Sequence, residues 1–395
     1  MRFPVIPRRT TPPALLALLI AASSCALELP DRTGMSSTTG QARSGDTTVP
    51  GDPLPSTTDA SGGPAPSTTT LVPLDPVTFE SLSGIHIIPN FSGRTSRSLS
   101  RWEREVPEVE DIRITSTADG AEQPAIWLAP SGDRDQPLLV VLHSWSAPYN
   151  QHASIPFALW ARENGWALIA PNYRGANTNA DALASELAVQ DVVDAIDFAV
   201  AQDGVDPDRV YTVGYSGGGM MSLILAGRHP DRVTAVAAWS PVYDLIDFYR
   251  RAGQSYPWQI WTACGGNPTT DEEAEAECRR RSPSTYLDAA RESGVPVFVA
   301  QGAADWLLPP SHSVSAFNVL ADPDDRLTAE EVEEIGRRRL PEHLAGEVTS
   351  ETFFGDGDPV VVFARQSARV WLVLFQAGHE MAYAPALRWF ATDPR

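Results

Sequence analysis

The sequence predicts an α/β fold in which a mostly parallel sheet is covered by helices on both faces. Short continuous apolar runs, typical of strands buried on both faces, occur at 138–142, 166–170 and 295–300. Segments with helical spacing of apolar residues separate these runs, and strands that alternate with helices favour parallel pairing. A further β-prone run leads through a glycine-rich turn around Ser216 directly into an apolar helix.

The other elements are predicted from the same patterns. Residues 112–115 alternate in polarity as an edge strand does, and 124–128 can pair beside them. Further buried strands are expected at 233–239 and 370–375. A helix before the glycine-rich turn carries apolar residues at i, i+3, i+4, i+7 and i+11. These are Val189, Val192, Val193, Ile196 and Val200.

Two segments interrupt this alternation. Residues 321–366 predict an insertion with a charged helix from Thr328 to Arg339 and a strand at 360–363. Residues 243–290 predict a lid over the carboxyl edge of the sheet, because aromatic residues gather there. These are Tyr243, Phe248, Tyr249, Tyr256, Trp258 and Trp261.

The beginning of the chain predicts a signal peptide at 1–25. Arg2 and Arg8 precede an apolar run at 14–22 that is too short to span a membrane permanently. The small residues before Cys25 resemble a bacterial lipoprotein processing site, so Cys25 is a candidate lipidation site; ordinary signal cleavage nearby is the alternative. The sequence therefore predicts an exported protein of bacterial type, either a cell-surface lipoprotein or secreted.

Two regions are expected after the signal peptide. Residues 26–78 are rich in Ser, Thr and Pro and predict a disordered tether, whereas 79–395 has the size of one large α/β domain. The formal net charge of −20 argues against nucleic acid and anionic membrane surfaces as partners. A lipid anchor is thus the only membrane association that the sequence predicts.

The cysteine count predicts a disulfide bond. If Cys25 is lipidated or removed, Cys264 and Cys278 remain as an even pair in an exported protein. Such a pair is expected to be oxidised, and two buried free thiols are the alternative.

Ser216 is the candidate nucleophile. It lies in a Gly-x-Ser-x-Gly motif between a strand and a helix, the context of a nucleophile elbow. The tight turn holds the serine in a strained conformation that exposes its oxygen at the top of the sheet. The helix N-terminus directs N–H groups towards a developing oxyanion. A glycine-rich turn without chemistry is the alternative.

A serine nucleophile needs a base, and the base needs an orienting acid. In an open α/β sheet both come from loops at the carboxyl ends of strands. His379 directly follows the last buried strand and is the expected base. Asp305 follows the strand ending at Ala300 and is the expected acid, with Asp244 as the runner-up. His143 also ends a strand, but where the oxyanion loop is expected.

The remaining site residues are expected around this group. The backbone N–H groups of Gly217 and Trp145 are the expected oxyanion donors. Tyr215 and Trp306 are expected to contact substrate, and with Trp145 and Trp239 they would form an apolar or aromatic acyl pocket. Packing in the core or lid is the alternative for each aromatic residue. No His-x-x-x-His or clustered Cys/His pattern supports a metal site, and no cofactor is expected.

As a set, these motifs resemble the catalytic domain of the prolyl oligopeptidase family, within the α/β-hydrolase superfamily. The resemblance covers roughly 108–392 and implies the α/β-hydrolase fold. It also implies a triad of Ser216, Asp305 and His379, which matches the choice made from position. The motifs are, in order, His143-Ser-Trp, Asn172-Tyr-Arg-Gly, Gly214-Tyr-Ser-Gly-Gly, Arg281-Ser-Pro, Gly302-Ala-Ala-Asp and Gly378-His-Glu.

The chain departs from the family in three ways. Larger members carry a β-propeller that screens peptide substrates, and this sequence has the tether in its place. Ser144 stands where the family has a glycine, and the gap between Asp305 and His379 is longer than usual. The resemblance implies an exported serine peptidase acting on small peptides or aminoacyl amides. A carboxylesterase for small neutral esters is one alternative, and a catalytically inactive surface binding module is another.

Overall fold

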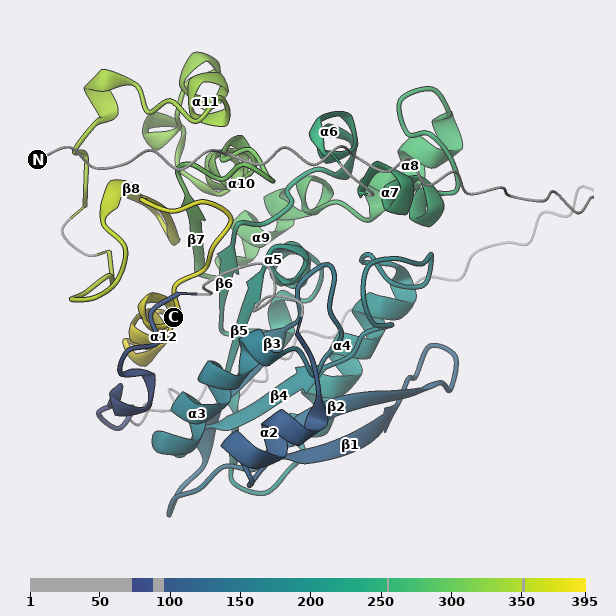
Figure 1. Ribbon diagram of the computed structural model, residues 1–395, viewed down its shortest axis with the longest axis vertical. Helices are drawn as coiled ribbons and strands as arrows, with labels where there is room; N and C mark the ends of the chain where they lie inside the picture. Colours follow the sequence, from purple (N-terminus) through teal and green to yellow (C-terminus); the bar gives the residue numbers. More distant parts are fainter. Residues whose placement is uncertain (1–72, 88–95, 254–255, 350–351) are drawn as a thin grey trace, which may run out of the picture. The chain divides into compact units, whose positions relative to one another are not determined.

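The computed structural model describes residues 73–87, 96–253, 256–349 and 352–395 (Figure 1). The predicted signal peptide, Cys25 and residues 26–72 of the predicted tether lie outside these ranges. The tether residues that are described contact the domain. The Thr78 N–H donates to Asn164 Oδ1 (2.7 Å), and the Thr78 hydroxyl donates to Glu163 Oε1 (2.6 Å). No helix in the described ranges is long and apolar enough to cross a bilayer.

In the described part of the chain, one sheet has the strand order β1-β2-β4-β3-β5-β6-β7-β9-β8. The pairs from β4 through β3, β5, β6 and β7 to β9 are parallel, and antiparallel pairs occur only towards the two edges. The predicted mostly parallel sheet is therefore confirmed. The strands are β1 Glu110–Thr115, β2 Glu122–Leu128, β3 Gln136–Leu142, β4 Ala167–Pro171, β5 Val205–Tyr215, β6 Ala235–Trp239, β7 Val297–Gly302, β8 Val361–Ser367 and β9 Val370–Phe375.

Helices cover both faces of the sheet (Figure 1). Apolar residues of α4, α5, α9 and α10 share one buried cluster, and those of α3 and α12 share the other. The helices are α2 Leu99–Glu105, α3 Ile155–Glu163, α4 Glu186–Val200, α5 Gly217–Arg228, α6 Leu245–Arg251, α7 Tyr256–Cys264, α8 Glu272–Arg280, α9 Leu287–Ser293, α10 Ser311–Leu320, α11 Ala329–Gly336 and α12 Ala384–Ala391.

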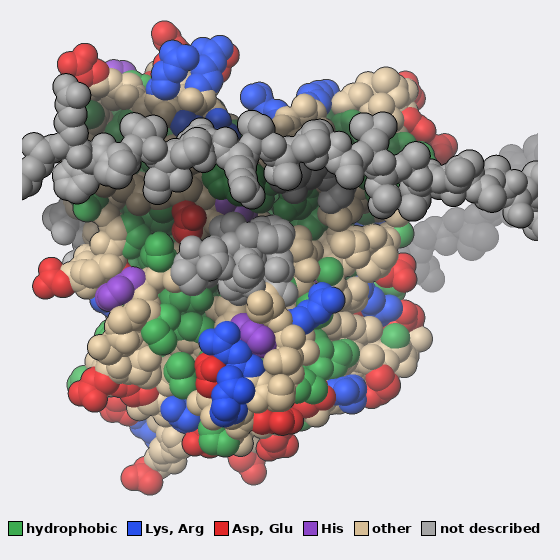
Figure 2. Space-filling view, in the orientation of Figure 1, with side chains coloured by type: hydrophobic (Ala, Val, Ile, Leu, Met, Phe, Trp, Pro, Cys, Tyr) green, Lys and Arg blue, Asp and Glu red, His purple; other side chains and the backbone are tan. Residues whose placement is uncertain are grey.

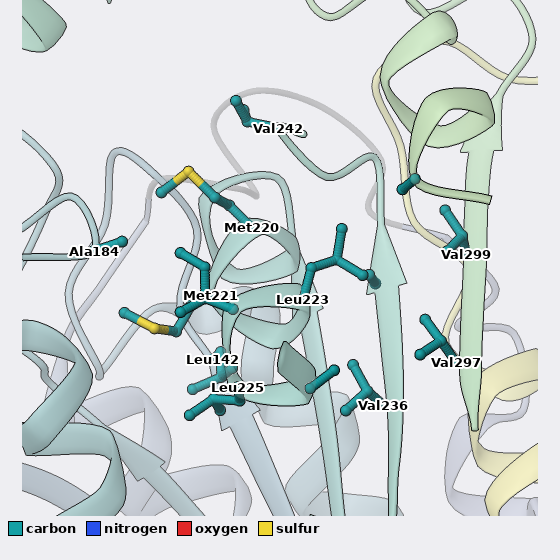
Figure 3. Packing of buried hydrophobic residues seen from close by; sticks show 14 of the residues in the cluster. Leu142, Ala184, Met220, Met221, Leu223, Leu225, Val236, Val242, Val297 and Val299 are labelled. Atoms are coloured by element: carbon teal, nitrogen blue, oxygen red, sulfur yellow. The ribbon is translucent and has the colours of Figure 1, made fainter. Parts of the chain in front are cut away.

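The central strands are apolar on both sides because both sides are covered. In β3, Leu138 and Val140 face one cluster whereas Leu139 and Val141 face the other, as the two-residue period of a strand requires. Figure 3 shows side chains of α5 packed among residues of β6 and β7. This packing holds the N-terminus of α5 rigidly at the end of β5.

The predicted lid consists mainly of α6, α7 and α8. The Trp145 ring, from the loop after β3, packs edge-on against Phe248 and Tyr256. Its Nε1–H donates to Gln259 Oε1 (2.7 Å). Helices α6 and α7 therefore lie on a loop at the carboxyl edge of the sheet. At the end of the predicted range, α9 packs against α5, one of the helices that cover the sheet, and its Leu287 is fully buried.

Cys264 and Cys278 form the predicted disulfide, which joins α7 to α8 with a Cα–Cα distance of 5.3 Å. Replacing both cysteines by serine is expected to destabilise the domain by about 3 kcal/mol, because the bond closes a loop of about 15 residues and restricts the unfolded chain. Urea unfolding of the two proteins measures the difference. Thiol titration of native protein from an oxidising compartment is the control, and finding both thiols free would contradict the pairing.

The segment 321–366 adds α11 and the edge strand β8. Helix α11 begins after Thr328, whose side chain forms a capping box with Glu331. It ends at Gly336, before the predicted end at Arg339, and Arg338 has a positive φ of 62°. The strand predicted at 360–363 is present as β8, which pairs antiparallel with β9.

Candidate active site

Ser216 lies at the tight turn between β5 and α5. Its φ is 57° and its ψ is −113°, a conformation that an L-residue rarely adopts. The Ser216 N–H donates to Trp239 O (2.8 Å), which ties the turn to β6. A Cβ on Gly214 would lie 2.2 Å from the carbonyl of Gly218. The glycines of the motif are therefore required, because the strand and helix backbones pass too close for a side chain.

The structure brings together the three residues selected from their positions at strand ends. The Ser216 hydroxyl lies 3.1 Å from His379 Nε2, and His379 Nδ1 lies 2.7 Å from Asp305 Oδ2. In the neutral imidazole the Nδ1–H donates to the carboxylate, which leaves Nε2 free of a proton and able to accept from the hydroxyl. All three residues are buried or nearly so.

The Asp305 carboxylate is held in its ionised form. Oδ1 accepts the N–H groups of Leu307 and Leu308 (both 2.9 Å), and Oδ2 accepts Gln301 Nε2–H (2.9 Å) as well as His379. Burial by itself would raise the pKa of Asp305. The charge and hydrogen bond of His379, with the Leu308 and Gln301 bonds, outweigh burial and lower that pKa below its usual value. The carboxylate thus remains an acceptor that fixes the tautomer of His379.

Three further residues support the group, and the sequence reasoning assigned this role to none of them. Gln301 also donates to Leu308 O (2.9 Å) and so braces the loop that carries Asp305. The Arg338 Nε–H, after α11, donates to Asp305 O (2.5 Å). The Tyr215 hydroxyl donates to His379 O (2.6 Å). The sequence offered one signal for Gln301, which is a polar residue in the otherwise apolar strand β7. The residues around Arg338 give no indication of its role.

The alternative acid and the other strand-end histidine lie in different surroundings. Asp244 caps α6, since its Oδ1 accepts the N–H groups of Ile246 and Asp247. His143 stacks on the ring of Tyr173 at a centroid distance of 3.8 Å. Burial lowers the pKa of His143 to about 4, so it is neutral near pH 7.

The two expected oxyanion donors lie side by side. A Cβ on Gly217 would lie 2.8 Å from the backbone nitrogen of Trp145. Within the described ranges the Trp145 N–H donates to no protein acceptor. Ser144, which stands in place of the expected glycine, donates both its N–H (3.0 Å) and its hydroxyl (2.9 Å) to Gln151 Oε1. The Ser144 N–H is thus already used, whereas the backbone nitrogen of Trp145 lies beside Gly217.

Of the four aromatic residues expected around an acyl pocket, Trp145, Tyr215 and Trp239 are buried and Trp306 is exposed. Trp239 is fully buried against Phe298 and Phe375, so for this residue the alternative of core packing holds. The alternation of side chains along a strand does not show whether the last residue points into the active-site cleft or into a face covered by other residues. Tyr215 is also buried, under the His379 loop. Trp306 is 55% exposed and lies beside the turn at Gly378.

The arrangement can perform acyl transfer: a hydroxyl hydrogen-bonded to a neutral imidazole, a carboxylate behind it, and backbone N–H groups beside the hydroxyl. In the described ranges, no group of three or more His, Cys, Asp or Glu side chains is placed to hold a metal ion.

Comparison with known proteins points to the same chemistry. Residues 153–333 match the prolyl oligopeptidase family. The acylamino-acid-releasing enzyme of Arabidopsis thaliana is 27% identical over 250 residues, 59% of this chain and 32% of that protein. Feruloyl esterase B of Thermothelomyces thermophilus is 30% identical over 125 residues, 30% of this chain and 43% of that protein. The chain thus spans about a third of the plant relative and less than half of the fungal one.

Among solved structures, an acylaminoacyl peptidase of Pyrococcus horikoshii superposes with a TM-score of 0.49 at 17% identity. The superposition covers 72% of this chain and 40% of that one.

Proposed function

We propose that this chain, which has the α/β-hydrolase fold and matches the prolyl oligopeptidase family at 153–333, is a serine hydrolase that cleaves small peptides or aminoacyl amides. Ser216 is the proposed nucleophile, His379 the base and Asp305 the orienting acid. The observation that carries the proposal is the continuous hydrogen-bond chain from the Ser216 hydroxyl through His379 to Asp305.

The proposed reaction has two half-reactions. As the Ser216 oxygen attacks the scissile carbonyl carbon, its proton passes to His379 Nε2, and Asp305 stabilises the imidazolium that forms. The carbonyl oxygen becomes an oxyanion beside the N–H groups of Gly217 and Trp145. His379 then protonates the leaving amine, which departs and leaves an acyl-enzyme. A water molecule then attacks the acyl-enzyme while His379 takes its proton. The acid is released as His379 returns a proton to the Ser216 oxygen.

The surroundings of the group support a small substrate. Ser216 is 9% exposed and His379 is 3% exposed, so a folded protein surface does not reach them. Acidic side chains occur at several places over the face that Figure 2 shows, and the net charge of −20 disfavours anionic substrates. The exposed ring of Trp306, beside the His379 loop, favours apolar or aromatic groups. The predicted signal peptide at 1–25 supports an exported enzyme.

Ester hydrolysis is the second candidate function. The same attack and oxyanion stabilisation serve esters and amides, and the similarity to feruloyl esterase B supports this chemistry. Amides demand more, because His379 must protonate a poor leaving group. The intact hydrogen-bond chain and the family match favour either enzyme over an inactive binding module.

A substrate panel tests the proposal. We expect rapid hydrolysis of short p-nitrophenyl esters, slower hydrolysis of neutral aminoacyl anilides, the slowest turnover for acidic anilides, and no cleavage of casein. The measurements are p-nitrophenol or p-nitroaniline release and gel analysis of casein. Steady casein cleavage that disappears in Ser216→Ala would overturn the size limit. Inertness towards the whole panel, without labelling by a fluorophosphonate probe, would overturn the proposed function and favour the binding module.

A further inference from the structure

A buried asparagine lies next to the two expected oxyanion donors. Asn177 belongs to the loop between β4 and α4, and its backbone N–H donates to Trp145 O (2.8 Å). A Cβ on Gly217 would lie 2.8 Å from Trp145 N and 2.9 Å from Asn177 Nδ2. The Trp145 N–H and the Asn177 amide therefore adjoin the same side of Gly217.

The direction of the Asn177 amide follows from its hydrogen bond. Oδ1 accepts the Leu183 N–H (2.9 Å), so the opposite end of the amide, Nδ2, points towards Gly217. No acceptor for Nδ2 is found in the described ranges. Asn177 is only 2% exposed, yet its Nδ2 atom keeps some contact with solvent. A buried side chain thus presents an unused donor to accessible space beside the nucleophile.

We propose that Asn177 Nδ2 is a third hydrogen-bond donor to the oxyanion, beside the N–H groups of Gly217 and Trp145. Donors that share one oxygen each lie about 3 Å from it, so they can be at most about 6 Å apart. Asn177 Nδ2 and Trp145 N meet this limit, because both lie within 2.9 Å of the same point. The inference rests on the proposed function, since the donor is useful only if Ser216 attacks a carbonyl.

The lid fixes this donor through Arg281. The Arg281 guanidinium is buried and donates to the carbonyl oxygens of Ala180 (2.8 Å) and Ala182 (3.0 Å). A third contact reaches Leu183 O (3.4 Å), the residue whose N–H holds Asn177 Oδ1. Glu277 of α8 pairs with Arg281 at 2.6 Å. Arg281 is therefore a positioning residue that connects the lid to the oxyanion side of the site.

Asn177→Asp is the sharpest test. It keeps an oxygen for the Leu183 N–H and keeps the backbone bond to Trp145, but it replaces the NH₂ donor with an oxygen that repels an oxyanion. We expect kcat for a p-nitrophenyl ester to fall about 100- to 1,000-fold with KM nearly unchanged. Affinity for a trifluoromethyl ketone, which binds as an anionic tetrahedral adduct, is expected to fall by a similar factor.

Asn179→Asp is the matched control. Asn179 lies in the same loop, and its Oδ1 accepts the N–H groups of Asp181 and Ala182 (both 3.0 Å). The same substitution keeps these two bonds and loses only the long contacts of Nδ2 with the carbonyl oxygens of Arg174 and Ala176 (both 3.4 Å), so it should leave activity nearly unchanged. If Asn177→Asp fails to fold, Asn177→Ala is measured instead, with the same expected split between kcat and KM. A folded Asn177 variant with wild-type kcat and wild-type ketone affinity would overturn the inference.

Failure of the inference and failure of the proposed function are distinguishable. Wild-type protein that is labelled by a fluorophosphonate and turns over esters establishes the hydrolase, whatever the Asn177 variants do. Wild-type protein that does neither rejects the proposed function, and the third donor with it.

Discussion

Ser216→Ala is expected to abolish fluorophosphonate labelling and to lower turnover of esters and anilides by about three or more orders of magnitude. The substitution removes the oxygen that lies 3.1 Å from His379 Nε2, so no acyl-enzyme can form. Activity above the water rate can persist only through oxyanion stabilisation and substrate binding. Probe labelling on a gel and ester turnover measure the two effects.

Ser222→Ala is the matched control for that experiment. Ser222 lies on the same helix, α5, and is fully buried, and its hydroxyl has no hydrogen-bond partner in the described ranges. The same change at this position should therefore leave labelling and turnover near wild type. Undiminished labelling of Ser216→Ala would remove Ser216 as the nucleophile.

Asp305→Asn is expected to lower turnover by about four orders of magnitude near neutral pH. An asparagine amide can turn its NH₂ towards His379 Nδ1, which places the imidazole proton on Nε2, where it cannot accept the Ser216 proton. Because the lowered pKa keeps Asp305 ionised near neutral pH, the wild-type carboxylate is present as an acceptor throughout that range, whereas Asp305→Asn lacks it at every pH. Turnover measured against pH for both proteins tests this.

Asp244→Asn provides the comparison for Asp305→Asn. Asp244 caps α6, and asparagine is an equally good capping residue, so this variant should keep nearly wild-type turnover and stability. If Asp244→Asn were as damaging as Asp305→Asn, or Asp305→Asn nearly silent, the assignment of the acid would be wrong.

Local patterns were sufficient to place the site on the correct edge of the sheet. The apolar runs at 138–142, 295–300 and 370–375 correspond to β3, β7 and β9, and the Ser216 turn lies between a strand and a helix as predicted. The carboxyl ends of parallel strands lie at one edge of the sheet, so the residues that follow these strands in sequence gather at that edge. For this reason Asp305 and His379 could be chosen before the structure was known.

Local patterns were insufficient where a side chain's role depends on what packs over it. Trp239 follows the same alternation as its neighbours, yet it lies in the core because Phe298 and Phe375 cover it. The part of the predicted lid from 287 onward belongs to α9, which packs against α5 instead.

The sequence by itself therefore determined the class of fold, the order of strands and helices, and which loops carry Ser216, Asp305 and His379. These features depend on the spacing of apolar side chains and on the positions of glycines, and both can be recognised within short stretches of sequence. Only the tertiary structure decided that Arg338 supports the Asp305 loop from 33 residues away, and that Tyr215 supports His379 from 164 residues away. It likewise decided that Asn177 faces Gly217. Such contacts arise from the way distant segments pack together, and no local period records that packing.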